Sequence, residues 1–289
     1  MSDVADVPVK SIFITGAASG IGRAGAELFL SNGWRVGAVD RDAEGLASIS
    51  ANGKADRLWS RQIDVTDAEA LRSGLAAFCA DNAHGGLDMM WNNAGIGQSG
   101  WFEDVPYDLA MRVVDINLKA VLTGASACLP YLKKSPGSMM FSTSSSSATY
   151  GLPMSAVYSA TKHGVKGMTE ALSVEWSRHG IRVADVLPGF IDTAILRTTP
   201  NHSKGGLTVT DEELQQGLPR RGMMRMIPAS AVAEAAWAAY HHPRRLHWYV
   251  PSSIRLLDCL TGLSPEFVRG RIRKALLTKA EEFIGQANT

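Results

Sequence analysis

The chain of 289 residues contains only three cysteines, Cys79, Cys128 and Cys259. They lie far apart and lack the short paired spacings of a zinc site, so we expect reduced thiols, no disulfide framework and no metal site. An excess of charge of one sign is also missing, because 29 basic residues balance 28 acidic ones and the formal net charge is +1. No global field therefore favours nucleic acid or an anionic membrane as a partner.

Long apolar runs are scarce as well. No uninterrupted apolar stretch reaches the roughly 18 residues of a transmembrane helix. The N-terminus, with Asp3 and Asp6, has neither the basic nor the apolar region of a secretory signal. We therefore expect a cytoplasmic protein without a transmembrane segment. Its 45% hydrophobic and 20% charged residues are typical of a globular fold.

Short β-branched or apolar stretches alternate with longer helical patterns along most of the chain. Strands are predicted at residues 11–15, 35–40, 58–64, 87–92, 138–142, 181–187 and 248–250, and helices at 21–31, 43–49, 67–80, 109–132, 158–178 and 229–240. This alternation predicts an α/β fold, a Rossmann-type doubly wound parallel sheet that binds ligands at the carboxyl ends of its strands. We expect residues 1–250 to form one nucleotide-binding domain and residues 251–289 a helical extension of it.

A glycine-rich turn follows the first predicted strand directly. The turn is Gly16-Ala17-Ala18-Ser19-Gly20-Ile21-Gly22, and its position between a strand and a helix is the context of a phosphate-binding turn. Gly16 would make the tight turn, Gly20 would let the backbone approach a pyrophosphate, and Gly22 would begin a helix whose first amides face the phosphates. The alternative is a turn without a ligand. Gly25 is expected to serve helix packing.

Asp40 ends the second strand, close to the offset of about 20 residues at which an acidic residue accepts hydrogen bonds from the adenosine ribose. Its charge would repel a 2′-phosphate, and Ser19, rather than a basic residue, precedes the second glycine of the turn. Arg41 leaves the alternative open, because a guanidinium just after the strand could hold that phosphate. We expect NAD to be preferred over NADP.

Tyr158 and Lys162 lie one turn apart on one face of a predicted helix. A free tyrosine has a pKa of about 10, which a cation within about 4 to 6 Å lowers by about one to three pH units. Lys162, with an oxidised nicotinamide nearby, would supply that field and make the phenol an acid/base group. A Tyr and a Lys at this spacing alone usually indicate only a solvated helix face.

Together these motifs make the chain resemble the short-chain dehydrogenase/reductase family from about Val9 to Val250. Further elements occur in the order of the family. They are Asp64-Val65 after the third strand, Asn92-Asn93-Ala94-Gly95 after the fourth, Asn117 in the long helix, Ser145 thirteen residues before Tyr158, and Pro188-Gly189 followed by Thr193.

The resemblance implies an oxidoreductase that transfers a hydride between a nicotinamide cofactor and a secondary alcohol or ketone. Ser145, chosen among the hydroxyls of residues 142–147 by its spacing to Tyr158, would hydrogen-bond the substrate oxygen. Tyr158 would exchange the proton, and Lys162 would also hold the nicotinamide ribose. Asn117 would interrupt its helix and shape a water-linked proton path, unless it is a mid-helix amide bonded within the core.

The resemblance also implies the cofactor contacts, most of them through the backbone. They are Gly16, Ser19, Gly20, Ile21, Gly22, Asp40, Arg41, Asp64, Val65, Asn93, Ala94, Gly95, Tyr158, Lys162, Pro188, Gly189, Ile191 and Thr193. Asp64 and Val65 would frame the adenine, residues 93–95 would pass under the cofactor, and Ile191 and Thr193 would meet the carboxamide. A homo-oligomer is implied in the same way.

Two alternatives to a dehydrogenase are a dinucleotide-binding regulator and a non-redox relative such as a dehydratase or epimerase. The complete set of Asn117, Ser145, Tyr158 and Lys162 argues against a regulator, and the compact length argues against an epimerase-like relative.

The remaining expectations concern the substrate and the C-terminus. A largely apolar secondary alcohol or ketone, with cyclic ones among the candidates, is predicted as the substrate. The candidate lining residues are Leu152, Pro153, Met154, Phe190, Ile195, Leu196 and the cluster at 223–226. Residues 194–228 are interrupted by glycine and proline and are predicted to cover the site. A basic amphipathic helix from Ser264 to near Gly285 is expected to pack against its own subunit or a neighbour, and a membrane-surface contact is the alternative.

Overall fold

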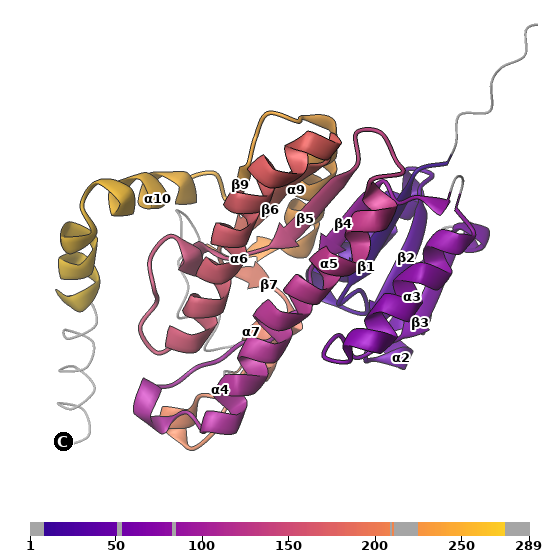
Figure 1. The fold of residues 1–289 in the computed structure, drawn as a ribbon. Coiled ribbons are helices and arrows are strands. Elements are labelled where there is room, and N and C mark those ends of the chain that lie inside the picture. The colour runs from indigo at the N-terminus through magenta and orange to yellow at the C-terminus, as the bar shows by residue number, and fades with distance from the viewer. Residues whose placement is uncertain (1–8, 51–53, 83–84, 209, 211–224, 275–289) are drawn as a thin grey trace, which may run out of the picture.

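One parallel sheet organises the protein. The computed structural model describes residues 9–50, 54–82, 85–208, 210 and 225–274 (Figure 1). Seven strands lie in the order β3-β2-β1-β4-β5-β6-β9, which confirms the predicted doubly wound α/β fold. Their bounds are β1 Ser11–Thr15, β2 Arg35–Asp40, β3 Leu58–Gln62, β4 Met89–Asn92, β5 Met139–Thr143, β6 Arg182–Pro188 and β9 His247–Val250.

Helices cover both faces of the sheet. One face carries α1 (Gly20–Ser31), α2 (Ala43–Ala47) and α9 (Ala229–His241), and the other carries α3 (Ala68–Ala80), α5 (Ala120–Leu132) and α6 (Ala156–Glu175). Figure 1 shows the second group lying across the sheet. The start of α3 illustrates the local cause, because Asp67 precedes it and its carboxylate accepts hydrogen bonds from the amides of Glu69 and Ala70.

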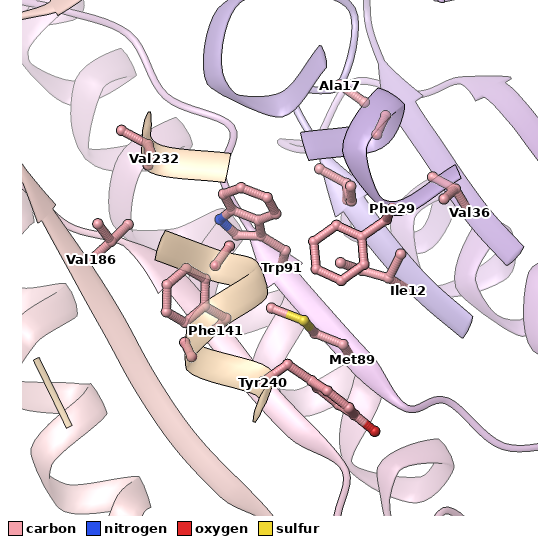
Figure 2. Close-up of a cluster of buried hydrophobic side chains, with 14 of the residues drawn as sticks. Ile12, Ala17, Phe29, Val36, Met89, Trp91, Phe141, Val186, Val232 and Tyr240 are labelled. Atoms are coloured by element: carbon pink, nitrogen blue, oxygen red, sulfur yellow. The ribbon is translucent and has the colours of Figure 1, made fainter. Parts of the chain in front are cut away.

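The central strands are apolar on both faces because both faces are covered. In β1, Ile12 and Ile14 pack towards α1 while Phe13 between them packs towards α3. Strands β4 and β5 alternate in the same way. Figure 2 shows the first of these two cores, in which the rings of Trp91 and Phe141 from the two strands lie 5.6 Å apart between centroids. Near-continuous apolar runs in the sequence therefore correspond to buried strands.

The helix predicted over 109–132 is interrupted. It consists of α4 (Tyr107–Val114), a π-helical turn at Asp115–Lys119 and α5, so that the irregular turn contains Asn117. The stretch Tyr107–Leu132 is long and apolar enough to cross a membrane by length and composition, but 44% of its most apolar window is buried inside the protein. There α5 packs against α3 as one of the helices that cover the sheet.

Short elements complete the part of the chain near the carboxyl ends of the strands. Strands β7 (Ile191–Asp192) and β8 (Ile227–Pro228) pair with each other, and α7 (Ala194–Thr198) follows β7. Residues 209 and 211–224 of the stretch that was predicted to cover the site, among them Met223 and Met224, lie outside the described residues.

The 3-10 turns among the described residues are distributed over the whole fold. They are Ala55–Arg57, Phe102–Asp104, Ser146–Ala148, Trp176–His179 and His202–Lys204.

The helix predicted to begin at Ser264-Pro265 is present over residues 265–274, but the helical part of the C-terminal segment starts earlier. The chain is already helical in α10 (Ile254–Leu263), breaks at Ser264 and is helical again over residues 265–274. The earlier start has a packing cause, because Ile254 is buried and its Cδ1 lies 3.1 Å from where a Cβ on Gly189 would stand. Gly285, the expected end of the helix, lies outside the described residues.

A buried acid and a histidine join the last two strands of the sheet. Asp185 of β6 is fully buried, and its carboxylate lies 2.7 Å from Nδ1 of His247 on β9. The other imidazole nitrogen lies 3.3 Å from Glu170 of α6. Burial raises the pKa of Asp185 to about 6. Burial also opposes charge on His247, but the hydrogen bond and the negative charge of Asp185 outweigh it and raise the histidine pKa.

This pair predicts how stability depends on pH. Because the pKa of both groups is raised on folding, the folded chain binds protons more tightly. The pair's contribution to the free energy of unfolding therefore falls as pH rises, from about 4 to about 6 for Asp185 and above the ordinary histidine pKa of 6.5 for His247. Asp258 affects the profile only at lower pH. Burial opposes charge on this carboxyl, but hydrogen bonds from Lys166 and Tyr249 outweigh it and lower the pKa, so its contribution to stability is lost only as the pH falls below about 4. We expect Asp185→Asn to flatten the profile above that pH when urea unfolding is measured at a series of pH values.

The control is Asp81→Asn, at an exposed carboxylate. An equal slope in wild type and Asp185→Asn would contradict the assignment.

Candidate active site

Most of the predicted cofactor and catalytic residues line one cavity of about 460 Å³ at the carboxyl ends of the strands. The residues brought together there are Gly16, Ser19, Gly20, Ile21, Asp40, Arg41, Asn93, Ala94, Gly95, Ser145, Tyr158, Lys162, Pro188, Gly189, Ile191 and Thr193. Asp64 and Val65 line a smaller hollow of about 80 Å³, which shares Gly16, Asp40 and Arg41 with the cavity. Gly22 and Asn117 do not line the cavity. Gly22 packs against Gly16, and Asn117 is hydrogen-bonded to Ile96.

The glycine turn is held in a shape that other residues could not adopt. Gly16 and Gly20 have φ angles of +69° and +52°, in the left-handed region that favours glycine. A Cβ on Gly16 would stand 2.7 Å from Cα of Ala94, and one on Gly22 would stand 2.1 Å from the Gly16 carbonyl oxygen. Ser19 precedes α1 without a side-chain cap, so the first amides of the helix remain available to an anion. Gly25 packs against Trp91, as predicted.

Asp40 is tied to the glycine turn by its side chain. One carboxylate oxygen accepts the Ala18 amide and the other accepts the Asp42 amide, each at 3.1 Å. A carboxylate offers about four acceptor positions, so two remain for a ligand. The exposed side chain of Arg41 follows at the same edge of the cavity.

Asp64 has its own local partner. Its carboxylate accepts hydrogen bonds from the amide and the hydroxyl of Thr66, and these bonds lower the pKa of Asp64. The carboxylate of Asp64 therefore stabilises a turn, while the residue's position borders the smaller hollow.

A hydrogen-bonded chain that the sequence did not reveal joins three strands to the glycine turn. Nε1 of Trp91 donates to the hydroxyl of Thr143, which donates to Oδ1 of Asn93, both at 3.0 Å. Nδ2 of Asn93 then donates to the carbonyls of Thr15 and Gly16. Thr143 is therefore a support of the site, and its only sequence signal was its place in the serine-rich run after β5.

The acid/base candidates come from α6 and from the turn after β5. Ser145 hydrogen-bonds the phenol of Tyr158, and its hydroxyl oxygen also accepts the Ser147 amide at 3.1 Å. Nζ of Lys162 donates to the Thr143 carbonyl at 2.9 Å and lies 5.6 Å from the centre of the tyrosine ring. Among the neighbouring hydroxyls, Ser144 donates instead to the Lys162 carbonyl.

Burial decides the charge state of this pair in the protein alone. Burial raises the pKa of Tyr158, opposed by the hydrogen bond with Ser145, and it lowers the pKa of Lys162 to about 8. The expected lowering of the tyrosine pKa is therefore not produced by the chain itself. The physical reason is that removing both groups from water disfavours phenolate and ammonium alike.

Asn117 holds the floor of the cavity. Its Oδ1 accepts the Ile96 amide at 2.8 Å, and its Nδ2 donates to the Ile96 carbonyl at 2.9 Å. A Cβ on Gly95 would stand 3.3 Å from Oδ1 of Asn117 and 3.5 Å from Nζ of Lys162. The π-helical turn thus presents an amide that fixes the loop after β4 directly beneath the lysine.

The expected apolar lining converges only in part. Ile195 and Leu196 border the cavity, but Leu152 and Pro153 line a separate hollow between α6 and the helix at residues 265–274. The loop after Thr149 turns them towards the C-terminal helix, which the sequence alone did not reveal.

The chain is similar to known proteins in sequence and in fold. The family model for short chain dehydrogenase matches residues 10–204. The chain is 31% identical over 209 residues to a 2,5-dichloro-2,5-cyclohexadiene-1,4-diol dehydrogenase of Sphingobium indicum, which covers 70% of this chain and 80% of that protein. It resembles the 3-ketoacyl-(acyl-carrier-protein) reductase of Brucella melitensis complexed with NADH, with 25% identity, a TM-score of 0.71 and coverage of 83% and 96%. It also resembles a variant of actinorhodin polyketide ketoreductase with NADPH, with 27% identity and a TM-score of 0.75. That match covers 85% of this chain and 97% of the ketoreductase.

The Thr143 hydroxyl is predicted to support cofactor binding. Thr143→Val keeps the shape but leaves Trp91 Nε1 and Asn93 Oδ1 without their partner, which costs about 1 to 3 kcal/mol for a buried group. We expect a lower free energy of unfolding in urea and weaker NADH binding in a fluorescence titration. Thr123→Val is the control, because that hydroxyl bonds the Lys119 carbonyl within one helix. NADH affinity equal to that of the wild type would refute the support role.

Proposed function

Because this chain belongs to the short-chain dehydrogenase/reductase family, and is therefore an oxidoreductase that binds a nicotinamide cofactor and transfers hydride, we propose that it interconverts a secondary alcohol and its ketone, with Tyr158 as the acid/base group. The observation that carries the proposal is the convergence of Ser145, Tyr158 and Lys162 on the cavity that also contains the glycine turn. A binding-only regulator would not need that convergence.

The residues present fit a dinucleotide. The close approaches at Gly16 and Gly22 leave a cradle that any Cβ would fill, and the uncapped start of α1 offers amides to a pyrophosphate. Asp40 would accept the adenosine ribose hydroxyls, and the hollow beside Asp64 and Val65 would take the adenine. Pro188, Ile191 and Thr193 would border the nicotinamide end, with Lys162 at its ribose.

The chain's own groups would handle the proton. When bound, the nicotinamide supplies or accepts the hydride and, when oxidised, places a positive charge beside the phenol. Ser145 would bond the substrate oxygen and hold it against Tyr158. Because burial raises the pKa of Tyr158, the phenol keeps its proton at neutral pH and would donate it to a ketone. In the opposite direction the phenolate would take the alcohol proton, stabilised by the Lys162 ammonium and the Ser145 hydroxyl.

We infer a preference for NAD over NADP. The support is Asp40, whose carboxylate is fixed by the Ala18 and Asp42 amides at the ribose edge of the cavity, where a 2′-phosphate would meet a negative charge. Arg41 is the opposing feature, and its exposed side chain makes the preference reversible by a single change.

The proposed substrate is an apolar, cyclic secondary alcohol. Ile195 and Leu196 give the cavity an apolar wall, and the Sphingobium relative is named as the dehydrogenase of a cyclohexadiene diol. The first experiment is a panel of cyclic secondary alcohols that includes cyclohexanol, with NAD and with NADP, followed by the absorbance of the reduced cofactor. No turnover across the alcohols and the matching ketones would refute the proposed reaction.

Tyr158→Phe is expected to lower kcat by about 10² to 10⁴, the range that general acid/base groups contribute. The ring keeps its packing, so NADH binding in a titration should stay close to that of the wild type. Tyr107→Phe removes a phenol from an exposed site and serves as the control. If Tyr158→Phe turns over at the rate of this control, another group moves the proton.

Asp40→Asn is expected to shift the ratio of kcat/KM for NAD over NADP by about tenfold towards NADP, which corresponds to about 1.4 kcal/mol. Asparagine retains one acceptor for the turn amides but removes the charge that repels the phosphate. Adding Arg41→Gln should reverse the gain with NADP, because the guanidinium would hold that phosphate. A wild type that already favours NADP would show that the ribose argument is wrong.

A further inference from the structure

The helix that carries Tyr158 begins without a cap of its own. The residue before α6 is Ser155, whose side chain makes no cap hydrogen bond. The first amides of a helix have no partner within the helix and need an acceptor from elsewhere. In α6 the amide of Tyr158 is one of these groups.

A glutamine from a different loop supplies the acceptor. Gln98 follows β4 by six residues and is 4% exposed, which is unusual for a long polar side chain. Its Oε1 accepts the Tyr158 amide at 3.4 Å. The hydroxyl of Ser155 donates in return to the Gln98 carbonyl at 3.0 Å. The two segments therefore satisfy each other, as the two ends of a capping box do within one helix.

The other end of the glutamine amide holds the loop before α6. Nε2 of Gln98 lies 3.4 Å from the Met154 carbonyl and 3.5 Å from the Gly100 carbonyl, and the Gly100 amide donates to Met154 at 2.9 Å. Met154 has a φ of +62°, the only non-glycine residue with a positive φ among those that the structure describes. Such a conformation persists only where its surroundings enforce it. Gln98 and Gly100 supply that enforcement four residues before the tyrosine.

We propose that Gln98 is a positioning residue that caps α6 from outside the helix and fixes the phenol of Tyr158 relative to the cofactor cavity. The inference rests on the proposed role of Tyr158. The loop that carries Gln98 is anchored on both sides of this residue. The Ile96 amide donates to Asn117, and the Ser99 carbonyl accepts the His202 amide at 3.0 Å. Losing the Gln98 side chain would therefore release the start of α6 rather than the loop. A shift of about 1 Å in a reacting group can reduce turnover by about a hundredfold.

The test compares three substitutions at this position. Gln98→Leu removes the acceptor and the donors, and Gln98→Asn keeps the amide but is one methylene too short to reach. Gln98→Glu keeps an acceptor for the Tyr158 amide, and its charge suits a helix N-terminus. Ser138→Ala is the control, because it removes another buried side-chain hydrogen bond, to the Leu132 carbonyl, at the opposite end of β5.

We expect Gln98→Leu and Gln98→Asn to lower kcat about tenfold to a hundredfold. The substrate for this measurement is the alcohol of the panel that the wild type oxidises fastest, or cyclohexanol. The KM for NAD should change little, because the glycine turn and Asp40 do not touch Gln98. Hydrogen exchange at the Tyr158 amide should become faster, and this readout needs no substrate. Gln98→Glu should restore the slow exchange, because it keeps the acceptor for the Tyr158 amide, but only part of kcat, because its second oxygen would face the Met154 and Gly100 carbonyls.

Either of two results would overturn the proposal: slow exchange and a control-like kcat in Gln98→Leu and Gln98→Asn, or exchange at the Tyr158 amide of Gln98→Glu as fast as in Gln98→Leu. If Gln98→Leu does not fold, the Asn and Glu variants decide between the same outcomes. A wild-type rate in Tyr158→Phe would refute the proposed function itself, whereas an inactive Tyr158→Phe with an unimpaired Gln98→Asn would refute only the cap.

Discussion

The close approach of the turn after β1 to the loop after β4 is the constraint on which the site depends. These strands are neighbours in the sheet although α1, β2, β3 and α3 separate them in sequence. Their carboxyl ends leave so little room that Gly16 must face Ala94 without a side chain. The Trp91–Thr143–Asn93 hydrogen bonds lock that approach from β4 and β5. Because the Thr143 carbonyl also receives Lys162, the cofactor cradle and the acid/base pair are parts of one rigid assembly.

The sequence predicted the features that depend on local pattern. The central strands follow from apolar runs buried on both faces, whereas β3 at the sheet edge is largely exposed. The roles expected of Gly16 and Gly22 follow from a turn between a strand and a helix. The sequence could not predict the Thr143 network, because its partners come from strands that meet only in the folded sheet. It also missed Gln98, since a capping side chain normally lies beside its own helix and this one is 60 residues away.

Two expectations rested on residue spacing, which does not show how deeply a side chain is buried or which distant segments surround it. The field of Lys162, with an oxidised nicotinamide nearby, was expected to lower the tyrosine pKa; in the protein alone the ammonium is itself buried and bonded to a carbonyl, so burial dominates the pKa of both groups. Leu152 and Pro153 were expected in the substrate cavity, and they face the C-terminal helix instead. Both outcomes depend on what surrounds a residue, which for these positions includes segments far away in sequence.

The approach of Ile254 to Gly189 joins the C-terminal segment to the end of the cavity that is proposed to hold the nicotinamide. The family model ends at residue 204, so α10 lies outside the part of the chain that this model matches. A chimera that exchanged this tail with a relative would inherit the glycine turn and the Tyr158–Lys162 pair unchanged. It would nevertheless place a different side chain beneath Gly189. A change at the position of Ile254 would therefore alter the packing behind this end of the cavity without altering any of the residues proposed to perform the chemistry.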